Sequence, residues 1–223
     1  MRASKRMAGI SSLCQGARRV IDVGCDHAQL CALLVTECGV EHAYASDIRP
    51  GPLENAARTI QALGLEGRVE AVLRDGLDGF EPEDADTIVI AGMGGDEIAG
   101  ILQRASWTKD GRHRLVLQPM TAAERLRRWL VENGYSIEKE ILIVDANKIY
   151  AVMNTTAGID RSDVKRYEYL FSAGLLRDPL WPQYKQKLTQ KYRVSAEGQR
   201  RAGKTGTMEQ RAYQLLLNLE DEV

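Results

Sequence analysis

Residues 19–27 read RVIDVGCDH, a β-branched run that ends in a glycine turn. Arg19–Val23 has the composition of a buried strand, and Gly24 follows it directly. A nucleotide-type ligand needs such a tight turn, together with backbone amides and the amino end of a helix. The segment therefore predicts an α/β sheet with a ligand site at the carboxyl end of this strand.

Outward from this turn, β-rich runs alternate with amphipathic stretches as far as about Thr156. This alternation is typical of a mostly parallel sheet flanked by helices. The expected strands are Arg19–Val23, His42–Ser46, Val69–Leu73, Thr87–Ile90 and Arg114–Leu117, and the expected helices are Gln29–Glu37, Pro52–Leu63 and Ala122–Glu132.

Two further runs, Ser136–Val144 and Lys148–Met153, are joined by the short link Asp145-Ala146-Asn147. A link of this length favours a hairpin, so the sheet is expected to finish antiparallel.

Beyond Gly158 the β-branched runs stop and apolar residues recur at helical spacing. The two stripes are Trp181, Tyr184, Leu188 and Tyr192, then Met208, Ala212, Leu215, Leu216 and Leu219. We predict an all-α appendage, a helical hairpin or short coiled coil. The chain is thus divided into residues 1–157 and residues 158–223.

The composition is that of a globular protein, with 44% hydrophobic and 27% charged residues among 223. Apolar runs such as Leu30–Val35 are far shorter than the roughly 18 residues of a membrane span, and the amino terminus lacks a secretory apolar region. We therefore expect a cytoplasmic protein without a membrane partner. The cysteines form no CxxC pair and the chain has only three histidines, so no metal site is predicted.

Charge is distributed unevenly along the chain. Residues 158–223 carry twelve Lys or Arg against nine acids, whereas residues 1–157 carry eighteen against twenty-two. A polyanionic partner would meet the carboxyl-terminal part first.

Carboxylates follow the strands at the places where a ligand would lie. Asp26 stands where the dinucleotide pattern GxGxxG has a glycine, and a carboxylate there repels a pyrophosphate but suits a sulfonium and an ammonium group. Asp47 can accept hydrogen bonds from ribose hydroxyls, and Asp75 from an adenine amino group. The alternative for each is an exposed turn acid. As a set they predict S-adenosylmethionine, held by Asp22, Gly24, Asp26, His27, Asp47, Ile48, Asp75, Gly76, Ala91, Gly92 and Met93.

The predicted loop 91–95 reads AGMGG. Three glycines in five residues are costly to order, so their clustering suggests backbone contact with a ligand, the alternative being a tight strand-to-helix turn. The signature Asn or Asp, Pro, Pro, aromatic of N6-adenine methylation is missing here, which counts against that reaction.

With these segments in view, the chain resembles the bacterial tRNA adenine-N1 methyltransferase family that modifies adenine 22, the TrmK type. Met120 and Cys25 depart from its usual Asn and Ser or Thr. The resemblance runs through Ser4-Lys5-Arg6, residues 22–27, Asp75-Gly76-Leu77, residues 88–95, Leu117-Gln118-Pro119 and residues 145–150, and more loosely through Tyr169-Leu170-Phe171 and Leu175-Leu176.

The resemblance implies a Rossmann-like class I methyltransferase sheet and methyl transfer to adenine N1 in the tRNA D arm. Asp26 and Gln118 are the expected catalytic residues, Asp26 being equally suited to hold the amino group of the cofactor. His27 can stack or donate a hydrogen bond, although a structural histidine is the more frequent case.

Basic side chains are the expected contacts to tRNA phosphates, the only partner predicted. A solvated helix face is the alternative for any one of them. They are Lys5, Arg6, Arg125, Arg128, Lys185, Lys187, Lys191, Arg193, Arg200, Arg201 and Lys204.

Two other functions stay open from the sequence. One is a methyltransferase for another base or a small molecule, and the other is a module that binds S-adenosylmethionine and RNA without turnover. A nicotinamide oxidoreductase is a distant third, because the chain lacks the glycine pattern that it requires.

Overall fold

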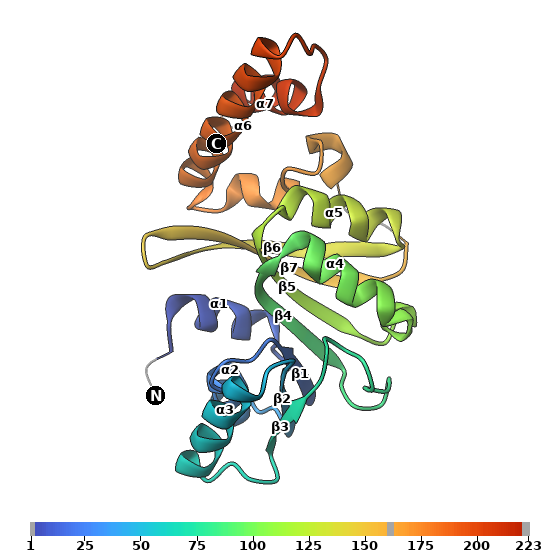
Figure 1. The fold of residues 1–223 in the computed structure, drawn as a ribbon. Coiled ribbons are helices and arrows are strands. Elements are labelled where there is room, and N and C mark those ends of the chain that lie inside the picture. The colour runs from blue at the N-terminus through green and yellow to red at the C-terminus, as the bar shows by residue number, and fades with distance from the viewer. Residues whose placement is uncertain (1–2, 160–162, 220–223) are drawn as a thin grey trace.

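The computed structural model describes residues 3–159 and 163–219 (Figure 1). Seven strands form one sheet in the order β3-β2-β1-β4-β5-β7-β6. Strands β1 to β5 pair in parallel, and β7 is antiparallel to both β5 and β6, so the predicted sheet is confirmed. The strands are β1 Arg19–Val23, β2 His42–Asp47, β3 Val69–Leu73, β4 Thr87–Gly94, β5 Arg114–Thr121, β6 Tyr135–Asp145 and β7 Lys148–Ala157.

Helices cover both faces of the sheet and enclose two apolar cores. Figure 1 shows α1, α2 and α3 on one face and α4 and α5 on the other. Because side chains alternate along a strand, neighbouring residues enter different cores: Val116 packs with α1 to α3, and Leu117 packs with α4 and α5. The helices are α1 Lys5–Leu13, α2 Gln29–Glu37, α3 Pro50–Leu63, α4 Gly95–Arg104 and α5 Ala123–Glu132, and a short 3-10 helix covers Ser106–Lys109.

The segment 91–95, predicted as a loop, is largely strand. β4 continues to Gly94 and pairs with β5 through shifted registers, Ala91 with Gln118 and Met93 with Pro119. The prediction was wrong because a glycine-rich run has no apolar period, whereas pairing with the neighbouring strand satisfies its backbone groups.

The carboxyl-terminal part forms the predicted helical hairpin. Helices α6, Trp181–Arg201, and α7, Met208–Asn218, pack together and are preceded by the 3-10 helices Val164–Tyr167 and Ala173–Arg177. Their apolar cluster also contains Leu142, Ile149 and Ala151 of the β6–β7 hairpin. The division at residue 157 stays a prediction, as does a coiled coil, and its two ranges include residues 1–2, 160–162 and 220–223, which lie outside the described residues.

A buried ion pair joins this helical part to the sheet. Glu140 Oε1 accepts hydrogen bonds from Nε and Nη2 of Arg127 at 2.9 and 2.8 Å, and Oε2 accepts from the Ser172 amide at 2.8 Å. Arg127 Nη1 also donates to the Tyr169 carbonyl at 3.3 Å. None of the described helices is both long enough and apolar enough to cross a membrane.

Candidate cofactor and catalytic site

The carboxyl ends of parallel strands meet at one edge of a sheet, and the predicted site residues lie along that edge. Along this edge the strand ends follow the order β3, β2, β1, β4 and β5. The turn after β1 is therefore central, with the ends of β2 and β3 on one side of it and the last residues of β4 and β5 on the other. In open α/β sheets this edge is where ligands bind.

The turn between β1 and α2 is built on Gly24. Its φ is +79°, which favours glycine, and a Cβ there would displace the flexible methyl end of the Met93 side chain of β4. The amides of Gly24 and Cys25 donate to the Ser46 carbonyl at 2.8 and 2.9 Å, so they are not free for a ligand.

The next residues of the turn are open to solvent. Asp26 and His27 are exposed and pair at 3.3 Å. Helix α2 begins after Ala28, which is left-handed with φ 51° and offers no side-chain cap. The amides at this helix end are therefore the ones available to a ligand carboxylate.

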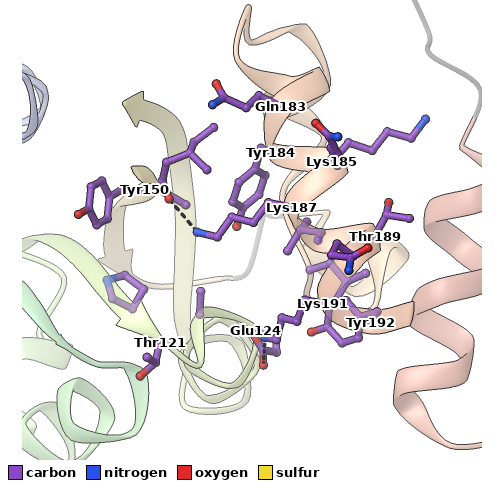
Figure 2. A pocket seen from close by; sticks show the side chains of 18 of the residues that line it. Thr121, Glu124, Tyr150, Gln183, Tyr184, Lys185, Lys187, Thr189, Lys191 and Tyr192 are labelled. Atoms are coloured by element: carbon purple, nitrogen blue, oxygen red, sulfur yellow. Dashed lines mark hydrogen bonds and ion pairs between the residues drawn. The ribbon is translucent and has the colours of Figure 1, made fainter. Parts of the chain in front are cut away.

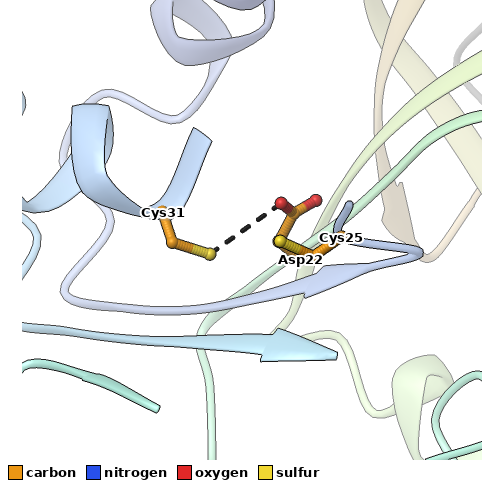
Figure 3. A group of neighbouring side chains, drawn as sticks. All are labelled: Asp22, Cys25 and Cys31. Atoms are coloured by element: carbon orange, nitrogen blue, oxygen red, sulfur yellow. Dashed lines mark hydrogen bonds between the residues drawn. The ribbon is translucent and has the colours of Figure 1, made fainter. Parts of the chain in front are cut away.

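Asp22 lies beneath this turn rather than at its surface. Asp22, Cys25 and Cys31 are buried, with one ligand-type atom of each within 4.8 Å of the others (Figure 3). Cys31 Sγ donates to Asp22 Oδ2 at 3.8 Å. Burial raises the pKa of Asp22 to about 7, and the hydrogen bond with Cys25 raises the pKa of Cys31. These shifts favour the protonated forms of Asp22 and Cys31, which counts against a metal site because metal ligands must be deprotonated.

Asp47 ends β2 as a nearly buried carboxylate, 4% exposed. Its Oδ1 accepts from the amide and Nε of Arg49 at 2.8 and 3.3 Å. Ile48, 59% exposed, follows it, and Leu73, 60% exposed, pairs with Asp47 in the neighbouring strand. Two exposed apolar side chains beside a carboxylate suit the flat face of a base next to its sugar. Leu73 was not predicted from the sequence, where its only signal was its place at a strand end.

Asp75, after β3, already has a partner. Its Oδ1 accepts from Arg104 Nη2 at 2.9 Å, and the carboxylate is exposed. Gly76 beside it packs against Ile101 of α4. A contact of Asp75 with an adenine amino group stays a prediction, and it would have to share or replace the arginine.

Gln118 and Arg6 meet at the end of β5 although 112 residues separate them. The Gln118 side chain is fully buried, and its Oε1 accepts from Arg6 Nη1 at 2.9 Å. Arg6 also lies beside Gly92, where a Cβ would be 3.4 Å from Nη1. Arg6, predicted to contact RNA, is therefore placed within the site, between α1 and the glycine-rich strand end.

Glycine at position 95 is required by the packing of two helices. A Cβ there would collide with the Ala122 carbonyl, where the amino ends of α4 and α5 approach each other. Gly95 is thus explained by helix packing, and ligand contact is not needed to account for this member of the glycine cluster.

The predicted RNA-contacting lysines of α6 line a cavity of about 1280 Å³ (Figure 2). Each amine also holds an intramolecular partner: Lys185 donates to the Leu219 carbonyl at 2.7 Å, Lys187 to the Ile149 carbonyl at 2.8 Å, and Lys191 pairs with Glu124 at 2.9 Å. The cavity lies between α6, the start of β7 and the start of α5.

Of the other predicted RNA contacts, Arg125 lines this cavity. Arg125 pairs with Asp96 at 2.6 Å, and Arg128 covers the Tyr169 ring at 4.9 Å. Lys5 and Arg193 are exposed, as are Arg200, Arg201 and Lys204. RNA binding by all of these side chains stays a prediction.

The sheet and its carboxyl edge define a Rossmann-like methyltransferase domain. Residues 3–153, which hold the edge and almost all of the sheet, match the family model described as a methyltransferase domain.

Within this class, the chain belongs to the tRNA (adenine(22)-N(1))-methyltransferase family. It is 34% identical over 179 residues to that enzyme of Bacillus subtilis, which covers 80% of this chain and 74% of the relative. The crystal structure of the B. subtilis M1A22 tRNA methyltransferase TrmK superimposes with a TM-score of 0.81 at 27% identity, covering 97% of each chain. Streptococcus pneumoniae Sp1610 in complex with S-adenosyl-L-methionine gives 0.83 at 30% identity over 97% and 98% of the chains.

Proposed function

We propose that this chain binds S-adenosylmethionine at the carboxyl edge of the sheet and methylates N1 of adenine 22 in tRNA. The B. subtilis relative is named for that reaction, and Sp1610 holds the cofactor in its crystal structure. The observation that carries the proposal is the convergence of the Gly24 turn, Asp47 and Gln118 on one edge.

The donor set at this edge fits the cofactor. Both hydrogen bonds that described residues donate to the Asp47 carboxylate go to Oδ1, which leaves Oδ2 for the ribose hydroxyls. Ile48 and Leu73 offer apolar surface to the adenine, and the uncapped start of α2 offers amides to the carboxylate. The cofactor supplies a methyl group on a positively charged sulfur.

The reaction asks little acid–base chemistry of the protein. N1 of an unpaired adenine has a free lone pair, so alignment and exclusion of water supply much of the rate. The target base must first leave its stack. Asp26 is exposed at the turn, where its carboxylate can stabilise the positive charge on the methylated base or the ammonium of the cofactor. Gln118 is fully buried, accepts from Arg6 through Oε1 and donates to the Pro119 carbonyl through Nε2 at 3.1 Å, so a contact with the base would require its side chain to be uncovered.

The cavity beneath α6 is the proposed path of the RNA backbone. Lys187 and Lys191 bring two positive charges to one wall, whereas the Lys185 amine points away toward the Leu219 carbonyl (Figure 2). Pro119–Thr121 at the catalytic edge also line this cavity. Phosphate contacts there would hold the tRNA without reading its sequence. With tRNA as substrate, we place the enzyme in the cytoplasm.

Mass spectrometry of nucleosides tests the function. Unmodified tRNA incubated with the protein and S-adenosylmethionine should yield N1-methyladenosine, and a transcript with guanine at position 22 should yield none. A different methylated nucleoside would indicate another substrate. Cofactor binding without any methylated nucleoside would indicate a binding module and would refute the proposal.

A further inference from the structure

Tyr150 is set apart from the other tyrosines of the chain. The other seven all pack in one of the three apolar clusters of the described residues. Tyr150 packs in none of them, its hydroxyl makes no hydrogen bond with a described residue, and its half-buried ring touches no described aromatic or cationic group. The fold therefore does not use this ring for its own stability.

The topology places Tyr150 at the catalytic edge. β7 runs antiparallel to β5, and their pairing ends at Leu117 with Met153, so Gln118 follows the last pair directly on β5 and Tyr150 lies three residues beyond it on β7. Tyr150 is the third residue of β7, and Gln118 belongs to the last residues of β5.

Tyr150 also lies on the same face of the sheet as Gln118. Ile149 and Ala151 pack against the helical hairpin, whereas Val152 packs in the core beneath α1 to α3. Because side chains alternate along a strand, Tyr150 shares the face of Val152. On β5, Val116 enters that same core, so Gln118 follows it on that face, and Met120 lies beside Gln118 through its sulfur, 3.6 Å from Nε2, although β5 shifts its register with β4 at this point. The hydrogen bond from Arg6 of α1 to Gln118 agrees with this placement.

Tyr150 lines the cavity beneath α6 together with the end of β5. Pro119, Met120 and Thr121 line the same cavity as Tyr150 (Figure 2). Met120 is 43% exposed, and its sulfur lies 3.6 Å from Gln118 Nε2. The other tyrosines that line the cavity, Tyr184 and Tyr192, are buried in the core of the helical hairpin.

We propose that Tyr150 is the aromatic platform on which the extruded target adenine stacks, between its ring and the Pro119–Met120 segment. This inference rests on the function proposed above. Enzymes that act on a base outside its stack hold it against aromatic or apolar side chains, and β4 carries no aromatic residue at its end to do so. Gln118, buried and held by Arg6, donates through Nε2 to the Pro119 carbonyl at 3.1 Å and so fixes the segment that forms the other wall.

The test compares Tyr150→Leu with Tyr150→Phe and Tyr150→Trp. Stacking on an aromatic ring corresponds to about a 10- to 100-fold effect, so Leu should lower kcat/KM for tRNA by that factor, whereas Phe and Trp should stay within about threefold of the wild type. The loss should fall mainly on kcat, because phosphate contacts carry most of the affinity. Affinity for S-adenosylmethionine and the Tm should be unchanged in all three variants.

A second readout does not depend on turnover. In tRNA with 2-aminopurine at position 22, the probe brightens when it leaves its stack and is quenched when it lies on an aromatic ring. The complex with Tyr150→Leu should therefore be brighter than the complexes with the wild type and Tyr150→Phe.

The outcomes separate this inference from the function. If the wild type forms N1-methyladenosine but Tyr150→Leu keeps its kcat/KM and its fluorescence, Tyr150 is not the platform and the function stands. A loss shared equally by Leu, Phe and Trp would also overturn the inference, since it would not depend on an aromatic ring. If the wild type methylates no adenine in tRNA, both proposals fall.

Discussion

At the scale of single residues, Asp47 is the carboxylate best prepared for a ligand. Its neighbours fix one oxygen, and burial strengthens a hydrogen bond to the other. Asp47→Asn should weaken S-adenosylmethionine binding by about 10-fold or more, because a hydrogen bond to a charged group is worth about 1.5–3 kcal/mol. Isothermal titration measures this, with Glu37→Gln, an exposed acid at the far end of α2, as the matched control. Identical titration curves for both variants would refute the role of Asp47.

Asp22 makes stability depend on pH. Its pKa is about 7 in the folded protein against an ordinary 3.8, so the folded state holds the proton more tightly than the unfolded chain. Stability therefore falls as pH rises from about 4 and levels off above about 7. The groups facing the carboxyl are Cys25, Cys31 and Arg6.

Asp22→Asn should remove this dependence, since an amide does not titrate. Between pH 5.5 and 8 the wild type should lose roughly 2 kcal/mol of unfolding free energy relative to the variant. Urea denaturation of the cofactor-free protein at the two pH values measures the difference. A gap between variant and wild type that stays constant with pH would contradict the raised pKa.

At the scale of elements, the β1–α2 turn depends on its fit against β4. Gly24→Ala imposes a left-handed alanine and displaces the flexible end of the Met93 side chain, and should cost about 1–2 kcal/mol. Gly64→Ala is the control, because Gly64 has φ +62° but open space around it, so only the conformational cost of about 1 kcal/mol applies.

The effect of this displacement can be isolated with a second substitution. Met93→Ala should relieve part of the destabilisation caused by Gly24→Ala, which appears as a favourable coupling of about 0.5 kcal/mol in a double-mutant cycle. If the free-energy changes of Gly24→Ala and Met93→Ala are strictly additive, the side chains at these two positions do not interact.

At the scale of the whole molecule, the Arg127–Glu140 pair ties the helical hairpin to the sheet. Arg127→Met leaves a buried carboxylate without its partner and should cost about 3–5 kcal/mol. Arg125→Met is the matched control, since the Arg125–Asp96 pair is exposed and should cost less than about 1 kcal/mol. Chemical denaturation measures the unfolding free energy that each variant loses. Equal losses would show that burial does not make the Arg127–Glu140 pair more important for stability than an exposed pair.

The cavity beneath α6 predicts how tRNA binding responds to salt. Replacing Lys185, Lys187 and Lys191 by Gln should raise the KM for tRNA. The slope of the logarithm of the binding constant against the logarithm of the salt concentration should become shallower by about 0.7–0.9 for each phosphate that is no longer neutralised. Arg18, Arg19 and Arg112, at the opposite edge of the sheet, form the charge-matched control. If the lysine variant keeps both the KM and the slope, these amines serve only their intramolecular partners.

The sequence by itself determined the succession of strands and helices along the chain, the glycine turn after β1, the acids at the strand ends and the helical hairpin. These features rest on local signals, namely apolar period, turn residues and capping, which neighbouring residues express without help from the rest of the chain. For the same reason α1, whose apolar period is weak, and α4, which begins within the glycine cluster at Gly95, were not predicted.

Only the tertiary structure decided which side chains meet. Arg6 reaches Gln118 across 112 residues, Asp22 is buried beneath the turn, residues 91–94 join a strand, and Tyr150 comes to the catalytic edge. Each of these depends on which strands lie side by side in the sheet. The arrangement of strands within the sheet follows from burying both of its faces at once, so it is a property of the whole chain that no single segment carries.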